Sequence, residues 1–210
     1  MDRVTLDVRR EKRGIVMRLF AITSASALAL LLAASPVRAQ DRWTAEVRGG
    51  ANVNSNQFAT TDLKTGIGFG GALGVRVLPD LFAYGGWEWQ HHGAKAPVFG
   101  VSAHVEDTGY AFGLRYAVPV SYRAKPWVRA GGLYNHVEIE GSSDGLLVAD
   151  SKHTLGLEVG GGLEVALGGP WSLTPGLRYR RFEPTVRFGG VESSSTLSDV
   201  TFDVGMVLRF

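Results

Sequence analysis

The closing stretch of the chain, residues 200–210, reads VTFDVGMVLRF. Apolar side chains occupy every second position of this stretch: Val200, Phe202, Val204, Met206, Leu208 and Phe210. Because side chains alternate between the two faces of a β-strand, one face is apolar and the other is mostly polar or small. The stretch therefore predicts a strand with one face against an apolar medium.

The same alternation recurs through the rest of the chain, most clearly in Gly109–Val118 and Leu155–Leu167. Five further segments are predicted strands: Trp43–Asn52, Gly66–Val77, Leu81–Gln90, Trp127–Glu138 and Trp171–Phe182. The 28 glycines disfavour helices and suit tightly curved strands. Together with the closing stretch, these segments predict eight strands.

The connections between the predicted strands alternate between long and short. The long ones are residues 53–64, 91–104, 141–152 and 183–196, and the short ones are 78–80, 120–125 and 168–170. Long outer loops that alternate with short periplasmic turns are typical of outer-membrane barrels. We therefore predict an all-β fold, an eight-stranded antiparallel up-and-down transmembrane β-barrel over residues 40–210.

Residues 1–39 have the order of a cleaved signal peptide. An apolar run, Leu19–Ala34, follows Met17 and Arg18, and the small residues Val37 and Ala39 then predict a cut before Gln40. The run is shorter than a usual membrane span. Acidic residues precede Met17, which makes Met17 an alternative start of translation.

Composition excludes several classes of protein. Seven of the 22 Lys and Arg residues and three of the 20 Asp and Glu residues lie in residues 1–39, so the rest carries 15 basic and 17 acidic side chains. It has no basic run, which excludes a nucleic-acid partner. The absence of cysteine excludes disulfides and thiolate metal sites.

A soluble, lipocalin-like barrel is the alternative architecture, because alternation does not tell which face is inside. Aromatic residues near the predicted strand ends favour the membrane, where they form interfacial girdles. They are Trp43, Trp89, Tyr116, Trp127, Tyr134, Trp171 and Tyr179. The faces opposite the apolar ones also carry glycine and mixed charges, unlike a soluble surface.

The end of the chain resembles the C-terminal signal by which outer-membrane barrels are assembled. Its residues are Phe202, Val204, Met206, Leu208 and Phe210. Over Trp43–Phe210 the chain is similar to the OmpA/OmpX-like small barrels of the outer membrane protein β-barrel family. The resemblance implies a monomer in the outer membrane with periplasmic termini, in contact with lipopolysaccharide, periplasmic chaperones and the barrel assembly machinery. Pro175 departs from the strand pattern and predicts a bulge or an early strand start.

The polar faces of the predicted strands carry a nearly balanced set of charges. They are Glu46, Arg48, Arg76, Glu88, Arg115, Arg129, Glu158, Glu164, Arg178, Arg180, Asp199 and Asp203, with Arg209 near the periplasmic end. An eight-stranded barrel is only wide enough for its own side chains. Because an unpaired buried charge is costly, we expect a lumen plugged by Arg–carboxylate pairs, with no cofactor.

The first functional interpretation is a structural or surface-interaction barrel that acts through its extracellular loops and is not an enzyme. A narrow porin-like channel for ions or small solutes is the alternative. A second alternative is an outer-leaflet lipid A-modifying enzyme, with His136 and Glu138, or His153 and Ser151, as parts of its site. Adjacent His91 and His92 lack a third ligand, so no metal site is predicted.

Overall fold

The computed structural model describes residues 42–55, 62–95, 102–120, 123–141, 147–188 and 191–210. The chain divides into two units, Met1–Ala39 and Gln40–Phe210, and all the described residues belong to the second. The predicted signal peptide, residues 1–39, therefore lies outside the described residues. Within the described part of the chain, no helix is long and apolar enough to cross a membrane.

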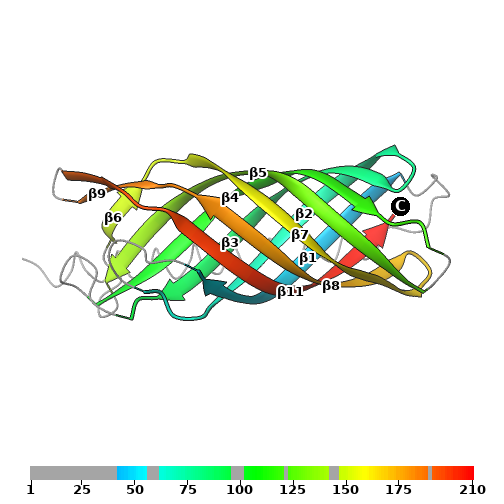
Figure 1. The fold of residues 1–210 in the computed structure, drawn as a ribbon, viewed down its shortest axis with the longest axis horizontal. Coiled ribbons are helices and arrows are strands. Elements are labelled where there is room, and N and C mark those ends of the chain that lie inside the picture. Colours follow the sequence, from blue (N-terminus) through cyan, green and yellow to red (C-terminus); the bar gives the residue numbers. More distant parts are fainter. Residues whose placement is uncertain (1–41, 56–61, 96–101, 121–122, 142–146, 189–190) are drawn as a thin grey trace, which may run out of the picture. The chain divides into compact units, whose positions relative to one another are not determined.

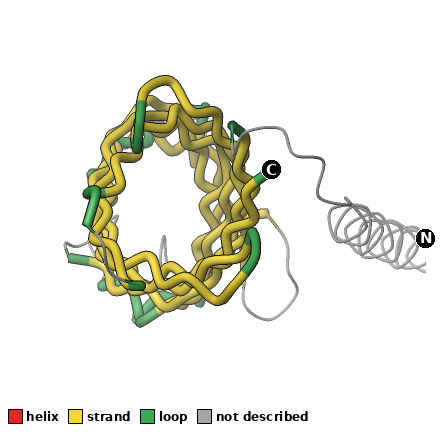
Figure 2. Tube along the Cα trace, turned by 90° about the vertical axis from the view of Figure 1, so that its right-hand side faces the viewer, coloured by secondary structure: helices red, strands yellow, loops and turns green. Residues whose placement is uncertain are grey.

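Eight long antiparallel strands form a closed barrel, which confirms the predicted fold class (Figures 1 and 2). They are β1 (Trp43–Asn54), β2 (Gly66–Leu78), β3 (Leu81–Gly93), β4 (Ala103–Ala117), β5 (Ala124–Gly141), β7 (Thr154–Gly168), β8 (Trp171–Phe182) and β11 (Leu197–Arg209). Each pairs with the next in this order, and β11 pairs with β1. The strands are tilted against the barrel axis, as closure requires (Figure 1).

The two ends of the barrel differ. The terminal end holds Trp43, Phe210 and the tight turns after β2 and β7. At the opposite end, the loop end, three short strands extend the wall: β6 (Leu147–Ser151), β9 (Thr185–Phe188) and β10 (Val191–Ser194). β6 pairs with β5 and β9, and β9 pairs with β10. The prediction of plain loops over residues 141–152 and 183–196 is therefore wrong for these segments, whose strands of four or five residues are too short to show a clear alternation.

The first and last strands close the sheet along their full length. Their register is continuous from Thr44 opposite Arg209 to Asn54 opposite Asp199. At the terminal end, the Trp43 amide donates to the Phe210 carbonyl at 2.8 Å, and the Phe210 amide donates back at 3.0 Å. This closure leaves neither β1 nor β11 as an unpaired edge of the barrel.

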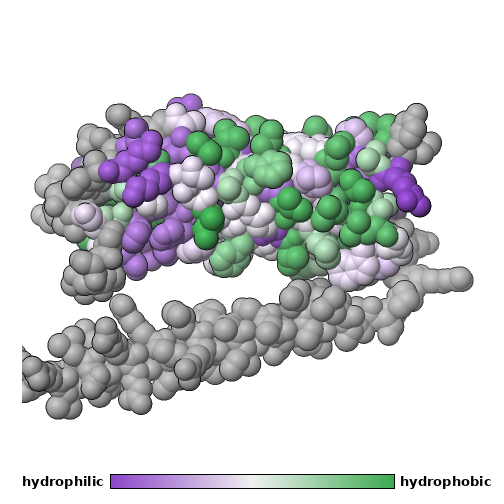
Figure 3. All heavy atoms as spheres, turned by 90° about the horizontal axis from the view of Figure 1, so that it is seen from below, coloured by the Kyte–Doolittle hydropathy of each residue, from purple (hydrophilic) through white to green (hydrophobic). Residues whose placement is uncertain are grey.

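The outer face of the barrel is an apolar belt. Large side chains on different strands point outward, such as Phe69, 54% exposed, and Phe112, 48% exposed. On the face shown in Figure 3, hydrophobic residues cover the middle of the barrel and much of its terminal half, whereas hydrophilic ones gather toward the loop end. Such a belt matches the hydrocarbon layer of a membrane.

Trp127 does not belong to an interfacial girdle. It is 3% exposed, and the Arg115 guanidinium lies over its ring at 5.1 Å. Residues two apart on a strand share a face, and Trp127 therefore points into the lumen with Arg129. The prediction that placed it on the outer surface is wrong.

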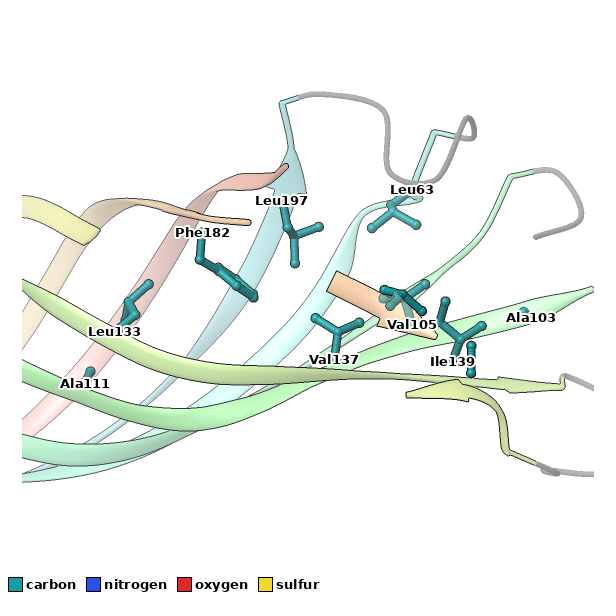
Figure 4. Close-up of a cluster of buried hydrophobic side chains, with 11 residues drawn as sticks. Leu63, Ala103, Val105, Ala111, Leu133, Val137, Ile139, Phe182 and Leu197 are labelled. Atoms are coloured by element: carbon teal, nitrogen blue, oxygen red, sulfur yellow. The ribbon is translucent and has the colours of Figure 1, made fainter. Parts of the chain in front are cut away.

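Toward the loop end the polarity of the wall inverts. Buried apolar side chains face the interior and form the loop-end cluster (Figure 4). Its members are Leu63, Ala103, Val105, Ala111, Leu133, Val137, Ile139, Ala149, Phe182, Val186 and Leu197. Between them on β4 and β5, Glu106 and Glu138 point outward. This section of the wall is built like a soluble protein, with its apolar side chains inside.

Pro175 interrupts the ladder between β7 and β8 without changing its register. Gly162 pairs with Gly176 and Val165 pairs with Leu173, in one register on both sides of the proline. The register shift between these strands lies instead at Ala166 and Gly168, beside the turn. The expected bulge at Pro175 is therefore wrong: the strand runs through, and only the proline's missing N–H is lost.

Small residues make room for Tyr84, whose side chain crosses the inner face of β4 and β5. Gly113 and Gly131 lie opposite each other on these strands. A Cβ at Gly131 would lie 2.2 Å from the Phe112 carbonyl oxygen and 2.7 Å from the Tyr84 hydroxyl oxygen. By contrast, a Cβ at Gly85 would meet nothing within 4 Å.

We expect Gly131→Ala to lower the free energy of unfolding by about 1–3 kcal/mol, because a side chain there forces the neighbouring backbone and Tyr84 to move. Gly85→Ala is the matched control and is expected to change it by less than about 0.5 kcal/mol. Urea unfolding in lipid vesicles, followed by tryptophan fluorescence, measures both. Equal effects of the two substitutions would contradict the close packing described above.

Candidate functional site

The candidate site is a network of charged side chains that fills the lumen, with Arg178 at its centre. Arg178 Nη1 donates to Glu88 at 2.8 Å and to Glu158 at 3.1 Å, and its Nε donates to Asp203 at 2.5 Å. These carboxylates come from β3, β7 and β11, while Arg178 comes from β8. One guanidinium therefore joins strands from opposite sides of the barrel.

Arg180 extends the network toward the loop end. Its Nη2 donates to Asp107 at 2.9 Å, and Asp199 and Glu88 each lie 3.5 Å away. The Asn135 amide also donates to Asp107, at 2.7 Å. Arg180 is fully buried, so these carboxylates balance its charge in place of water, although its Nε has no hydrogen-bond acceptor among the described residues.

Further arginines flank the centre of the network. Arg48 bonds to Glu88, and Arg129 bonds to Glu158. The Tyr84 hydroxyl also donates to Glu158, at 2.6 Å, and the Arg129 guanidinium lies 4.2 Å from the centre of the Tyr84 ring. Glu158 is thus held by three partners from different strands.

A separate ion-pair group lies nearer the terminal end. Glu164 accepts from Arg115 at 2.8 Å and from Arg209. A cavity between this group and the centre is lined by Glu46, Arg115 and Arg129, among others, and has room for about one water molecule. This cavity is therefore too small for a hydrated ion.

The structure places all but one of the predicted lumen charges in these ion pairs. They are Glu46, Arg48, Glu88, Arg115, Arg129, Glu158, Glu164, Arg178, Arg180, Asp199 and Asp203. Among the described residues, Arg76 joins none of these pairs, and its guanidinium lies 5.6 Å from the centre of the Phe82 ring. Sequence reasoning missed Asp107, although continuing the alternation of β4 back from Gly109 would have found it.

The charges are balanced in total but not along the barrel. The central network joins four arginines, at positions 48, 129, 178 and 180, to six carboxylates, at positions 46, 88, 107, 158, 199 and 203. Arg76, Arg115 and Arg209 outnumber Glu164 toward the terminal end. The lumen is therefore acidic at its centre and basic near the chain termini.

The histidines lie near the loop end and do not form a hydrolase triad. The His136 Nε2 atom lies 3.1 Å from Glu138, but the buried Ser151 hydroxyl accepts the Val137 amide at 2.8 Å. The His153 ring packs on His136 instead, 4.6 Å between centroids. Among the described residues, the Ser151 hydroxyl thus bonds to the backbone of the wall and not to His153.

The adjacent histidines of β3 point in opposite directions. His91 is on the outer face, 3.0 Å from Glu106, whereas His92 is fully buried in the interior. Successive side chains of a strand point to opposite faces, so the two rings cannot hold one ion together.

The sequence model of the family described as "Outer membrane protein beta-barrel domain" matches residues 25–210. The chain belongs to this family. It is therefore an outer-membrane protein, and the apolar belt faces the lipid of that membrane.

Solved outer membrane proteins are similar in structure to this family member. Neisserial surface protein A has a TM-score of 0.58 and 18% identity, over 80% of this chain and 97% of that chain. The outer membrane protein OprG from Pseudomonas aeruginosa has a TM-score of 0.49 and 11% identity, over 80% of this chain and 93% of that chain. No curated protein sequence matches the chain. The likeness to the neisserial protein shows the same barrel architecture.

Within this outer membrane barrel, we expect Arg178→Met to lower the free energy of unfolding by about 3–5 kcal/mol, because it leaves Glu88, Glu158 and Asp203 buried without their shared cation. The matched control is Arg187→Met, which removes the exposed pair of Arg187 with Glu192 and is expected to cost at most about 1 kcal/mol. Urea unfolding of both variants in lipid vesicles tests this. A loss at position 178 no larger than that at position 187 would show that the lumen pairs are not essential.

Proposed function

We propose that this outer-membrane barrel has a structural and surface-interaction role, with a closed lumen and with its binding surfaces at the loop end. The observation that carries the proposal is the filling of the lumen in three successive layers. Glu164 and its two arginines lie near the terminal end, the Arg178 network lies in the middle, and the loop-end cluster follows.

The layered filling argues against the alternative of a channel. A hydrated ion would first meet guanidinium and carboxylate groups that form ion pairs with one another. It would then meet Val105, Val137 and Ile139, which offer no polar group. Moving a charge into such an apolar layer without compensation costs many kcal/mol.

We further propose that the loop end faces the outside of the cell and that the termini face the periplasm. In support, β6, β9 and β10 extend the wall at the loop end, whereas the terminal end has tight turns. A wall with polar outward side chains suits contact with lipopolysaccharide and with external partners. The barrel acts as a monomer in this proposal.

The proposed assembly signal offers an apolar face to the chaperones and to the barrel assembly machinery. Phe202, Val204, Met206 and Phe210 are exposed on the outer side, while Leu208 is buried. The alternating side chains and the terminal aromatic residue support recognition of this strand during membrane insertion.

We expect a planar lipid bilayer that contains the purified protein to show no steady, discrete openings. The heat-dependent gel mobility of the same sample verifies folding. Discrete openings whose preference for cations over anions changes in the Glu164→Gln variant would show current through the lumen. That outcome would overturn the closed-lumen proposal in favour of a narrow channel.

A role without catalysis predicts that His136→Ala leaves lipid A unchanged. In the described residues, no hydroxyl group hydrogen-bonds to His136, so this imidazole has no nucleophile to activate. Mass spectrometry of lipid A from cells with the wild-type or variant barrel, and from cells without it, makes the comparison. A lipid A species that requires both the barrel and His136 would contradict the proposal.

A further inference from the structure

A row of carboxylates crosses the outer wall near the loop end. Glu106 on β4 lies directly opposite Glu138 on β5, and Glu138 lies directly opposite Asp150 on β6. Like charges in such cross-strand positions repel each other and destabilise a sheet. The row therefore needs a positive charge to balance it.

Basic side chains of the described chain do not balance the Glu138 and Asp150 end of this row. Arg187 pairs in the ladder with Asp150, but its guanidinium bonds to Glu192 instead. Among the described residues, neither Glu138 nor Asp150 forms an ion pair with a lysine or an arginine. This end of the row is thus left with an uncompensated charge.

An imidazole completes the group on the same face. His136 lies two residues before Glu138, so both side chains point outward from β5. One ligand atom from each of His136, Glu138 and Asp150 can be chosen so that all three lie within 4.8 Å of one another. Among the described residues, the Nδ1 atom of His136 has no hydrogen-bond partner.

We propose that His136, Glu138 and Asp150 bind a divalent transition-metal ion of the zinc class. One imidazole nitrogen with two carboxylates is a donor set that suits Zn²⁺, whereas Ca²⁺ and Mg²⁺ prefer oxygen alone. Bonds of about 2.0–2.1 Å place tetrahedral ligand atoms about 3.3 Å apart. Rotation of the two accessible carboxylate side chains closes the remaining distance, and water takes the fourth position.

Aromatic stacking holds the imidazole in place. The centre of the His153 ring lies 4.6 Å from that of His136 and 4.9 Å from that of Tyr134. His153 is thus a positioning residue. A bound ion would join β5 to the short β6 and remove the repulsion between their carboxylates, which stabilises the extended wall. This role goes beyond the proposed surface function and does not depend on it.

The test is calorimetric titration of Zn²⁺ into the untagged full-length protein, purified in detergent and freed of metal with a chelator. We expect one ion per chain, a rise of the thermal unfolding midpoint on binding, and a visible absorption band when Co²⁺ replaces Zn²⁺. His136→Ala and the nearly isosteric Asp150→Asn are each expected to weaken Zn²⁺ binding at least about tenfold and to abolish the thermal shift.

The matched control is His91→Ala. His91 lies 3.0 Å from Glu106 on the same outer face, but among the described residues no third ligand atom lies within 4.8 Å of this pair. We expect its Zn²⁺ affinity to equal that of the wild type. Absence of binding to the wild type, or equal affinity of the folded Asp150→Asn variant and the wild type, overturns the proposal. Equal weakening by His91→Ala also overturns it.

Discussion

Closure of the sheet is the constraint on which the rest of this structure depends. The hydrocarbon core of a membrane offers no water, so every backbone N–H and C=O group needs a partner within the protein. The continuous register of β1 with β11 meets this need. Closing a sheet of only eight strands then fixes a lumen so narrow that side chains must fill it. The charged network, the glycines around Tyr84 and the inward Trp127 all follow from that width.

The narrow lumen also explains why the cations of the central network are arginines. Arg178 reaches three carboxylates at once because its planar guanidinium carries five donors in fixed directions. A lysine ammonium is a compact, strongly hydrated charge and would need water that this interior has little room to hold. Arginine thus links strands on opposite sides of the barrel and desolvates at a lower cost.

The sequence predicts the part of each strand that faces lipid, but not where the wall continues into water. The strand at Val200–Phe210 and most of the lumen charges are predicted by the same alternation, because along the apolar belt the apolar side chains point outward and the polar ones point into the lumen. Toward the loop end this relation inverts on β4, where Ala103 and Val105 point inward and Glu106 points outward. The predicted strand therefore begins later than β4 does, and it omits Asp107. The sequence does not predict β6 for another reason. This strand pairs with β9, which is distant in the sequence, and such a pairing produces no periodic pattern of apolar residues. The proposed metal ligands combine both difficulties, because Asp150 reaches Glu138 only through that strand.

The charged network of the lumen meets the loop-end cluster at Arg180. Its guanidinium is held by Asp107 and Asp199, yet it also lies 5.8 Å from the centre of the Phe182 ring, which belongs to the loop-end cluster. Beyond this level on β4 and β5, apolar side chains such as Val105 and Val137 face the interior, whereas Glu106 and Glu138 face outward. A cation at this level has apolar side chains above it and lipid beyond the wall, so it depends entirely on its carboxylates. Arg180 therefore fixes how the two sections of the wall meet, because neither section alone could solvate it.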